Sequence, residues 1–181
     1  LFIYLQPDFA STVSGTNHVA QLRDWYADLF LTQNKEWRIR AGQSKVPYGF
    51  ENLQSSQNRL ALDRNDALNS AVKDERDFGL FLYYAPTDIR ALFRRLVDSG
   101  LKGSGDYGML GVGVYNGQTA NQPERNDNKH VIVRAAYPYE FSNGQVLEVG
   151  ASAYRGMFNV TKAAVVPVGR PAVPVGRKPA V

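Results

Sequence analysis

The stretch KHVIVRAAYPYEFSNGQVLEVGASAY, residues 129–154, decides the fold class of this chain. Its first half, residues 129–141, alternates an apolar face with a more polar face, and residues 147–154 repeat that alternation after the turn Ser142-Asn143-Gly144. Alternation with a period of two predicts β-strands, and Asn-Gly between two such runs is a strong hairpin signal. The stretch therefore predicts an antiparallel hairpin of two long strands.

The same alternation recurs outside this hairpin. Between residues 21 and 31, for example, Trp25 and Leu29 share one face, and Asp24 and Asp28 share the other. Five further strands are expected, at residues 1–9, 21–31, 37–44, 78–84 and 107–115. The chain is thus expected to be all-β and antiparallel, with about seven strands.

One segment, residues 87–100, follows a helical period instead. Ile89, Leu92, Phe93 and Leu96 recur at helical spacing, and Gly100 can end the helix. Thr87 is expected to act as its N-cap. The segment predicts one short amphipathic helix.

The lengths of the connections alternate along the chain. Long polar connections, including residues 47–76 and 116–128, fall at one end of the expected sheet, whereas short turns and the helix fall at the other. Bacterial outer-membrane barrels have this arrangement, with short periplasmic turns and long external loops. The helix is then expected to be a periplasmic plug or cap on the barrel end.

Alternation by itself is equally typical of a soluble β-sandwich and of a transmembrane barrel. Three features favour the barrel: strands of roughly 9–13 residues, aromatic residues near strand ends such as Trp37 and Tyr137, and small residues on the apolar face such as Ala135 and Ala151. A soluble antiparallel β domain that binds a ligand or a carbohydrate is the alternative.

Composition excludes several classes of function. The chain has 21 Lys and Arg against 17 Asp and Glu, a net charge of +4 that does not indicate a nucleic-acid partner. Without Cys and with two His, a metal site is not expected, and no cofactor is indicated. No His or Ser completes a catalytic group around the pairs Asp24/Asp28 and Asp74/Glu75, so we do not expect an enzyme. No apolar run approaches the ~18 residues of a transmembrane helix.

The two ends of the sequence suggest a piece of a longer chain. Leu1 stands within an alternating run, without Met or a basic leader, and the last residues repeat the pattern Val-Pro-Val-Gly-Arg. We therefore expect residues 1–160 to be a partial barrel and residues 161–181 to be an irregular, Pro-rich tail.

The run RIRAGQSKVPYGFE, residues 38–51, resembles the strand-to-loop signature of the phosphate-selective porins (the porin O and P family). The pieces ERDFG at 75–79, DIR at 88–90, GLKGSGDYG at 100–108 and GVYNGQ at 113–118 are similar to the same family in order and spacing. The resemblance covers about residues 1–160 and not the Pro-rich tail.

This resemblance implies a sixteen-stranded barrel in the bacterial outer membrane, usually a trimer, through which small hydrophilic solutes diffuse passively. It also implies a long external loop, residues 47–76, that folds into the lumen and narrows it. Its partners would be small solutes or anions, with phosphate possible, outer-membrane lipid and further copies of itself. The seven strands would then form somewhat less than half of the wall.

Strand parity places Arg38, Arg40 and Arg134 on the polar face, which would line the lumen. Arg38 and Arg40 are about 6–7 Å apart along their strand. Basic side chains at a constriction favour anions, so these residues are candidate pore-lining and anion-binding groups. Two interpretations stay open at this point: a dedicated phosphate site, and a general or weakly anion-preferring pore.

Lys45 occupies the family's Gly-Gln-x-Lys-x-Pro position and is the fourth candidate. Simple parity places it on the face of Ile39, away from the lumen, unless a bulge near Gly42 reverses it.

Eight charged residues of the expected constriction loop, four of each sign, are candidates for the narrow part of the pore: Arg59, Asp63, Arg64, Asp66, Lys73, Asp74, Glu75 and Arg76. This balance indicates either a transverse field in a general diffusion pore or a solvated loop with ion pairs at the rim. His18 and His130 are both expected at the rim.

Overall fold

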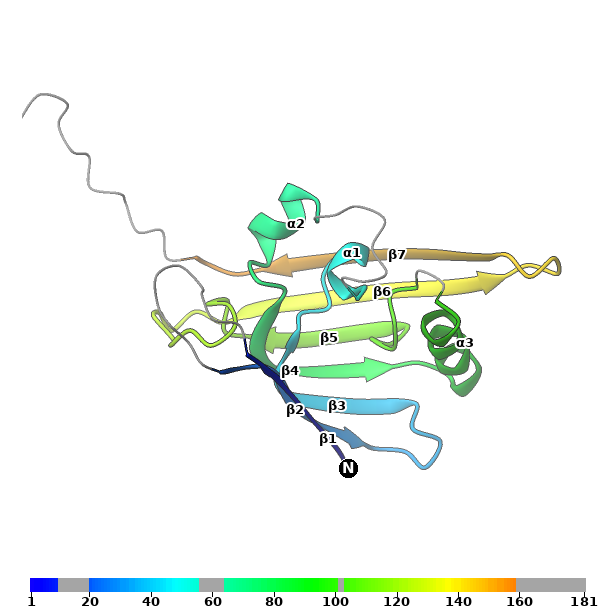
Figure 1. Ribbon diagram of the computed structural model, residues 1–181, viewed down its shortest axis with the longest axis horizontal. Coiled ribbons are helices and arrows are strands. Elements are labelled where there is room, and N and C mark those ends of the chain that lie inside the picture. The colour runs from blue at the N-terminus through cyan, green and yellow to red at the C-terminus, as the bar shows by residue number, and fades with distance from the viewer. Residues whose placement is uncertain (10–19, 56–63, 101–102, 159–181) are drawn as a thin grey trace, which may run out of the picture.

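The computed structural model describes residues 1–9, 20–55, 64–100 and 103–158. Its centre is one antiparallel sheet whose seven strands follow the order of the sequence (Figure 1). The strands are β1 (Phe2–Asp8), β2 (Gln21–Phe30), β3 (Trp37–Lys45), β4 (Arg76–Tyr84), β5 (Leu110–Tyr115), β6 (His130–Glu140) and β7 (Val146–Arg155). The sheet is not closed, and β1 and β7 are its two edges. The predicted all-β antiparallel class is confirmed, as part of a barrel wall.

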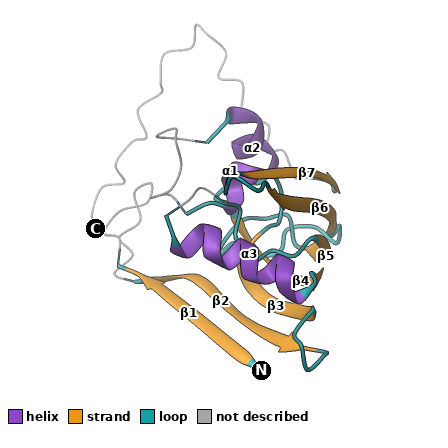
Figure 2. Cartoon of the chain, turned by 90° about the vertical axis from the view of Figure 1, so that its right-hand side faces the viewer, coloured by secondary structure: helices purple, strands orange, loops and turns teal. Residues whose placement is uncertain are grey.

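Three helices accompany the sheet: α1 (Phe50–Leu53), α2 (Asp66–Ala71) and α3 (Thr87–Asp98). Figure 2 shows the sheet curved into a trough, with α1 and α3 on its concave side. α3 is the predicted amphipathic helix, although Pro86 rather than Thr87 is its N-cap. Among the described residues, no helix has the length and apolar character needed to cross a membrane.

The two faces of the sheet differ in the way that the barrel hypothesis requires. On the convex face, the exposed fractions are 37% for Trp25, 49% for Leu29, 48% for Val133 and 61% for Val149. No second layer of described residues covers these apolar side chains. A soluble sandwich would bury its apolar face and expose its polar face, which is the opposite of this arrangement.

Two connections between strands pack against the concave face of the sheet. Val46 and Val72, at the two ends of the connection that holds α1 and α2, pack with Phe81 and Ile132 of the sheet. At the short-turn end, Ile89 and Phe93 of α3 pack against Ala85 and Ala136. Both connections therefore lie on the inner side of the wall.

The strand that was expected from residue 107 begins three residues later, at Leu110. Gly105 and Gly108 have φ angles of +85° and +77°, a conformation that glycine adopts without strain. A Cβ at position 108 would lie 2.7 Å from the Leu110 carbonyl oxygen. These two glycines turn the chain, so that residues 103–109 lie on the concave face before β5 begins.

Candidate functional site

The basic side chains of β3 are paired with a carboxylate of the neighbouring strand. Asp28 on β2 lies directly opposite Arg40 in the strand register. Arg40 donates two hydrogen bonds to Asp28, from Nε at 2.7 Å and from Nη2 at 2.9 Å. Arg38 Nη1 lies 3.4 Å from Asp28 Oδ2. The two guanidiniums are buried on the concave face, where both contact the Asp28 carboxylate.

Arg40 is also stacked on an aromatic ring. Its guanidinium carbon lies 3.7 Å from the centre of the Tyr26 ring and 5.7 Å from that of Tyr107. Tyr107 belongs to the segment between α3 and β5, and burial raises the pKa of its phenol. These contacts fix the orientation of Arg40 against the wall.

Lys45 points to the inner side, so the simple parity expectation is wrong. Beyond Gly42, whose φ is +125°, β2 pairs with β3 at Gln43 and no further. The Lys45 side chain is buried, and its Nζ donates to the Gln54 carbonyl oxygen at 2.6 Å. The connection that carries α1 therefore covers the end of β3 and holds Lys45 beneath it.

The base of this connection is a cluster of alternating charges. Glu75 lies 3.5 Å from Lys45, 3.2 Å from Arg64 and 2.9 Å from Arg76. Arg76 also donates to both carboxylate oxygens of Asp24, at 3.0 and 2.9 Å. The cluster ties the described end of this connection, residues 64–75, to β2 and β3 on the concave side.

The other charges of the expected constriction loop lie apart from this cluster. Asp66, in the first turn of α2, and Lys73 and Asp74 are exposed. Arg59 and Asp63 lie outside the described residues. The structure therefore brings three of the eight charged residues together, namely Arg64, Glu75 and Arg76.

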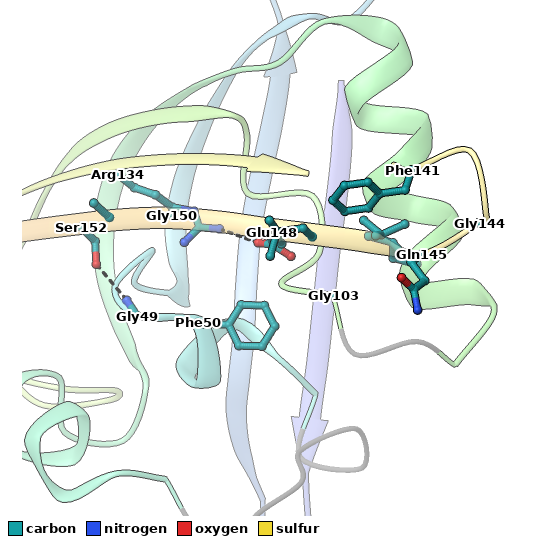
Figure 3. A pocket seen from close by; sticks show the side chains of 14 residues that line it. Gly49, Phe50, Gly103, Arg134, Phe141, Gly144, Gln145, Glu148, Gly150 and Ser152 are labelled. Carbon is teal, nitrogen blue, oxygen red and sulfur yellow. Dashed lines mark hydrogen bonds and ion pairs between the residues drawn. The ribbon is translucent and has the colours of Figure 1, made fainter. Parts of the chain in front are cut away.

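Arg134 is paired on the opposite side of the trough. Its Nη2 donates to Ser104 Oγ at 2.9 Å and lies 3.5 Å from Glu148 Oε1. Figure 3 shows Arg134 and Glu148 turned toward each other beside a cavity of about 1030 Å³ along β7. In the same view, the Gly49 backbone N–H donates to Ser152 Oγ at 3.1 Å and holds α1 against this edge.

A second, more polar cavity of about 810 Å³ lies between the strands β1 to β3 and the segment around α3. Ten charged residues line it, five of each sign: Asp8, Arg23, Asp24, Arg40, Lys45, Glu75, Arg76, Arg94, Asp98 and Asp106. The charge balance that the sequence predicted for the loop thus extends to the wall.

Several residues of the interior escaped the sequence analysis. Asp77 of β4 accepts hydrogen bonds from the backbone N–H groups of Gln118 and Thr119, at 2.9 and 3.2 Å. The Asn121 N–H donates to Gln43 Oε1 at 2.9 Å. These contacts hold the connection between β5 and β6 against the long-loop ends of β3 and β4. No periodic pattern in the sequence indicates these contacts, because they join residues that are far apart in the chain.

His130 is the histidine that the structure describes, and it packs among aromatic rings. His130 was expected at the rim, but it is fully buried at the start of β6. Its ring packs on Tyr115, Tyr154 and Phe158 at centroid distances of 5.1, 6.1 and 4.5 Å. His18 lies outside the described residues. Among all the residues that the structure describes, no cluster of three or more metal-ligating side chains occurs.

Comparison with protein families gives one match. The family model described as phosphate-selective porin O and P matches residues 1–168, which extends the resemblance into the start of the Pro-rich tail. Neither the curated proteins nor the solved structures gave a match.

Proposed function

The chain belongs to the phosphate-selective porin O and P family, and from this membership we propose that it forms part of the wall of a water-filled outer-membrane channel. Small hydrophilic solutes would diffuse through this channel passively. The observation that carries the proposal is the contrast between the two faces: Val133 and Val149 are exposed on the convex face, whereas Arg40 and Arg134 are buried on the concave face. Lipid outside and water inside explain both faces at once.

The channel requires more strands than the seven described here. An open sheet edge in lipid leaves backbone N–H and C=O groups unpaired, which costs several kcal/mol for each group. We therefore propose that β1 and β7 pair with further strands of a sixteen-stranded barrel and that the barrel is a trimer in the bacterial outer membrane. Residues 1–160 would belong to the wall, and the tail at 161–181 would lie outside it.

For selectivity, we propose a general diffusion pore with a weak anion preference. Arg38 and Arg40 share Asp28, and Arg134 faces Glu148. A permeating anion would meet these cations already partly neutralised, so a tight, dedicated phosphate site is the less favoured interpretation.

The test is electrical recording from the full-length protein, purified from outer membranes in detergent and inserted into planar bilayers. We expect stable conductance steps, a reversal potential slightly on the anion side in a KCl gradient, and no saturable block of chloride current by millimolar phosphate. Saturable block would instead establish a phosphate site. A protein that folds without detergent and never conducts would overturn the channel.

A further inference from the structure

The segment Gly103–Tyr107, between α3 and β5, crosses the inner face of the wall. At one side, Asp106 is bound to β3: Arg38 Nη1 lies 3.4 Å from its carboxylate, and Arg38 Nη2 donates to its carbonyl oxygen at 2.5 Å. At the other side, the Ser104 N–H donates to Glu148 of β7 at 3.1 Å. The segment is therefore anchored to strands on both sides of the trough.

A side chain of α3 also binds this segment. Arg90 of α3 donates to Asp106 Oδ2 from Nη2 at 2.9 Å and also donates to the Lys35 carbonyl oxygen in the turn between β2 and β3. Phe93, on the buried face of α3, is fully enclosed. The Asp106 carboxylate thus joins two guanidiniums, one from the wall and one from the helix.

The segment also borders the water-accessible space. The cavity of about 810 Å³ has Ser104, Asp106 and Tyr107 on one side, together with Arg94 and Asp98 of α3 and its C-terminal end. The opposite side is the wall of β1 to β3. Any displacement of the segment toward or away from that wall changes the cross-section of this space.

We infer that Gly103–Tyr107 is a second constriction of the proposed pore, near its short-turn end, and that Asp106 is the positioning residue that fixes its width. The inference rests on the proposed channel function. It adds to residues 47–76 a narrowing that enters from the opposite end of the barrel. Gly103 and Gly105 give the segment little intrinsic stiffness, so its position depends on its anchors.

The test compares two variants of the full-length porin that lose the same charge from the same cavity. Asp106→Asn removes the charge that joins Arg38 to Arg90. Asp98→Asn is the matched control, because Asp98 is exposed and its carboxylate makes no hydrogen bond or ion pair with the described residues. We expect Asp106→Asn to raise single-channel conductance by about 1.5-fold or more and to speed the entry of larger neutral sugars into liposomes. Asp98→Asn should change ion preference slightly and leave sugar entry unchanged.

A second readout does not depend on current. The chain has no Cys, so Ser104→Cys introduces a single thiol at a buried position of the segment. We expect this thiol to react slowly with a methanethiosulfonate reagent and several-fold faster when Asp106→Asn is added, because the segment is released. Equal reaction rates, or equal sugar entry in the Asp106→Asn and Asp98→Asn proteins, would overturn the inference. A folded wild-type protein that does not conduct would instead overturn the channel itself.

Discussion

At the scale of single residues, the interior is governed by the cost of leaving a charge without a partner. A buried guanidinium is tolerated when a carboxylate and further hydrogen bonds compensate for its lost hydration. Asp28 provides this for Arg38 and Arg40, and Asp106 provides it for Arg38 and Arg90, so the three cations together keep a net positive charge of about one toward the lumen. The ion preference of the pore should therefore depend on how far the guanidinium charges exceed the carboxylate charges in this group.

We predict that Arg38→Gln combined with Arg40→Gln moves the reversal potential in a KCl gradient toward the cation side, because Asp28 is left without its two partners. Arg155→Gln is the control, since Arg155 is exposed and pairs in register with Val131, on the convex face. It should leave the reversal potential where it was.

Substitution of the carboxylate partner tests the direction of the shift in reversal potential. Asp28→Asn frees Arg40 from its carboxylate, leaves Arg38 paired with Asp106 alone, and should move the reversal potential toward the anion side. If neither the double substitution nor Asp28→Asn moves the reversal potential of a protein that still inserts and conducts, these side chains are not on the permeation path.

At the scale of elements, β3 depends on one glycine. Gly42 has a φ of +125°, and a Cβ there would lie 2.4 Å from the Trp25 carbonyl oxygen and 2.8 Å from Tyr26 Cα. Both are backbone atoms of β2, which cannot move aside without loss of strand pairing. Gly42 therefore allows β2 and β3 to approach each other at the place where Lys45 turns inward.

Gly42→Ala should consequently destabilise the folded barrel by about 1–3 kcal/mol, through a strained backbone and the clash with β2. The measurement is the temperature at which the folded band is lost in semi-native gel electrophoresis. Gly100→Ala is a close comparison, because Gly100 also has a positive φ, +73°, but among the described residues nothing beyond its chain neighbours lies within 4 Å of its Cβ position. A Gly42→Ala protein as heat-resistant as the wild type would show that β2 and β3 can separate at this point.

The sequence allowed the strands and α3 to be predicted, but not the short helices α1 and α2 or the way in which the connections fill the interior. The seven strands were expected, most of them from alternation, and helical spacing located α3, because both signals are local in the chain. The position of Asp106 depends on Arg38, which is 68 residues away, and on two glycine turns. For Lys45, simple parity alone indicates the wrong face, and the alternative of a bulge near Gly42 indicates the right one, because parity holds only while both neighbouring strands continue to pair.

At the scale of the whole molecule, aromatic pairs mark both ends of the convex face. Trp37 and Tyr84 lie 4.6 Å apart between ring centres at the short-turn end, and Trp25 and Phe78 lie 5.3 Å apart at the long-loop end. Amphipathic rings favour the two interfaces between lipid and water. The aliphatic residues between the two pairs, such as Leu80, would then face the hydrocarbon.

This arrangement predicts that a charge on the convex face becomes more harmful toward its middle. Val133 pairs with Val112 on β5 and with Ala153 on β7, between the two ends, whereas Val131 pairs with Arg155 at the long-loop end. Val133→Arg should destabilise the inserted protein by about 2–4 kcal/mol, and Val131→Arg by about 0–1 kcal/mol. The measurement is the free energy of unfolding in lipid vesicles, from urea titration followed by tryptophan fluorescence. In a soluble β domain, both side chains would meet water. The two substitutions would then have equally small effects on the free energy of unfolding and would reduce aggregation. That result would refute a lipid-facing wall.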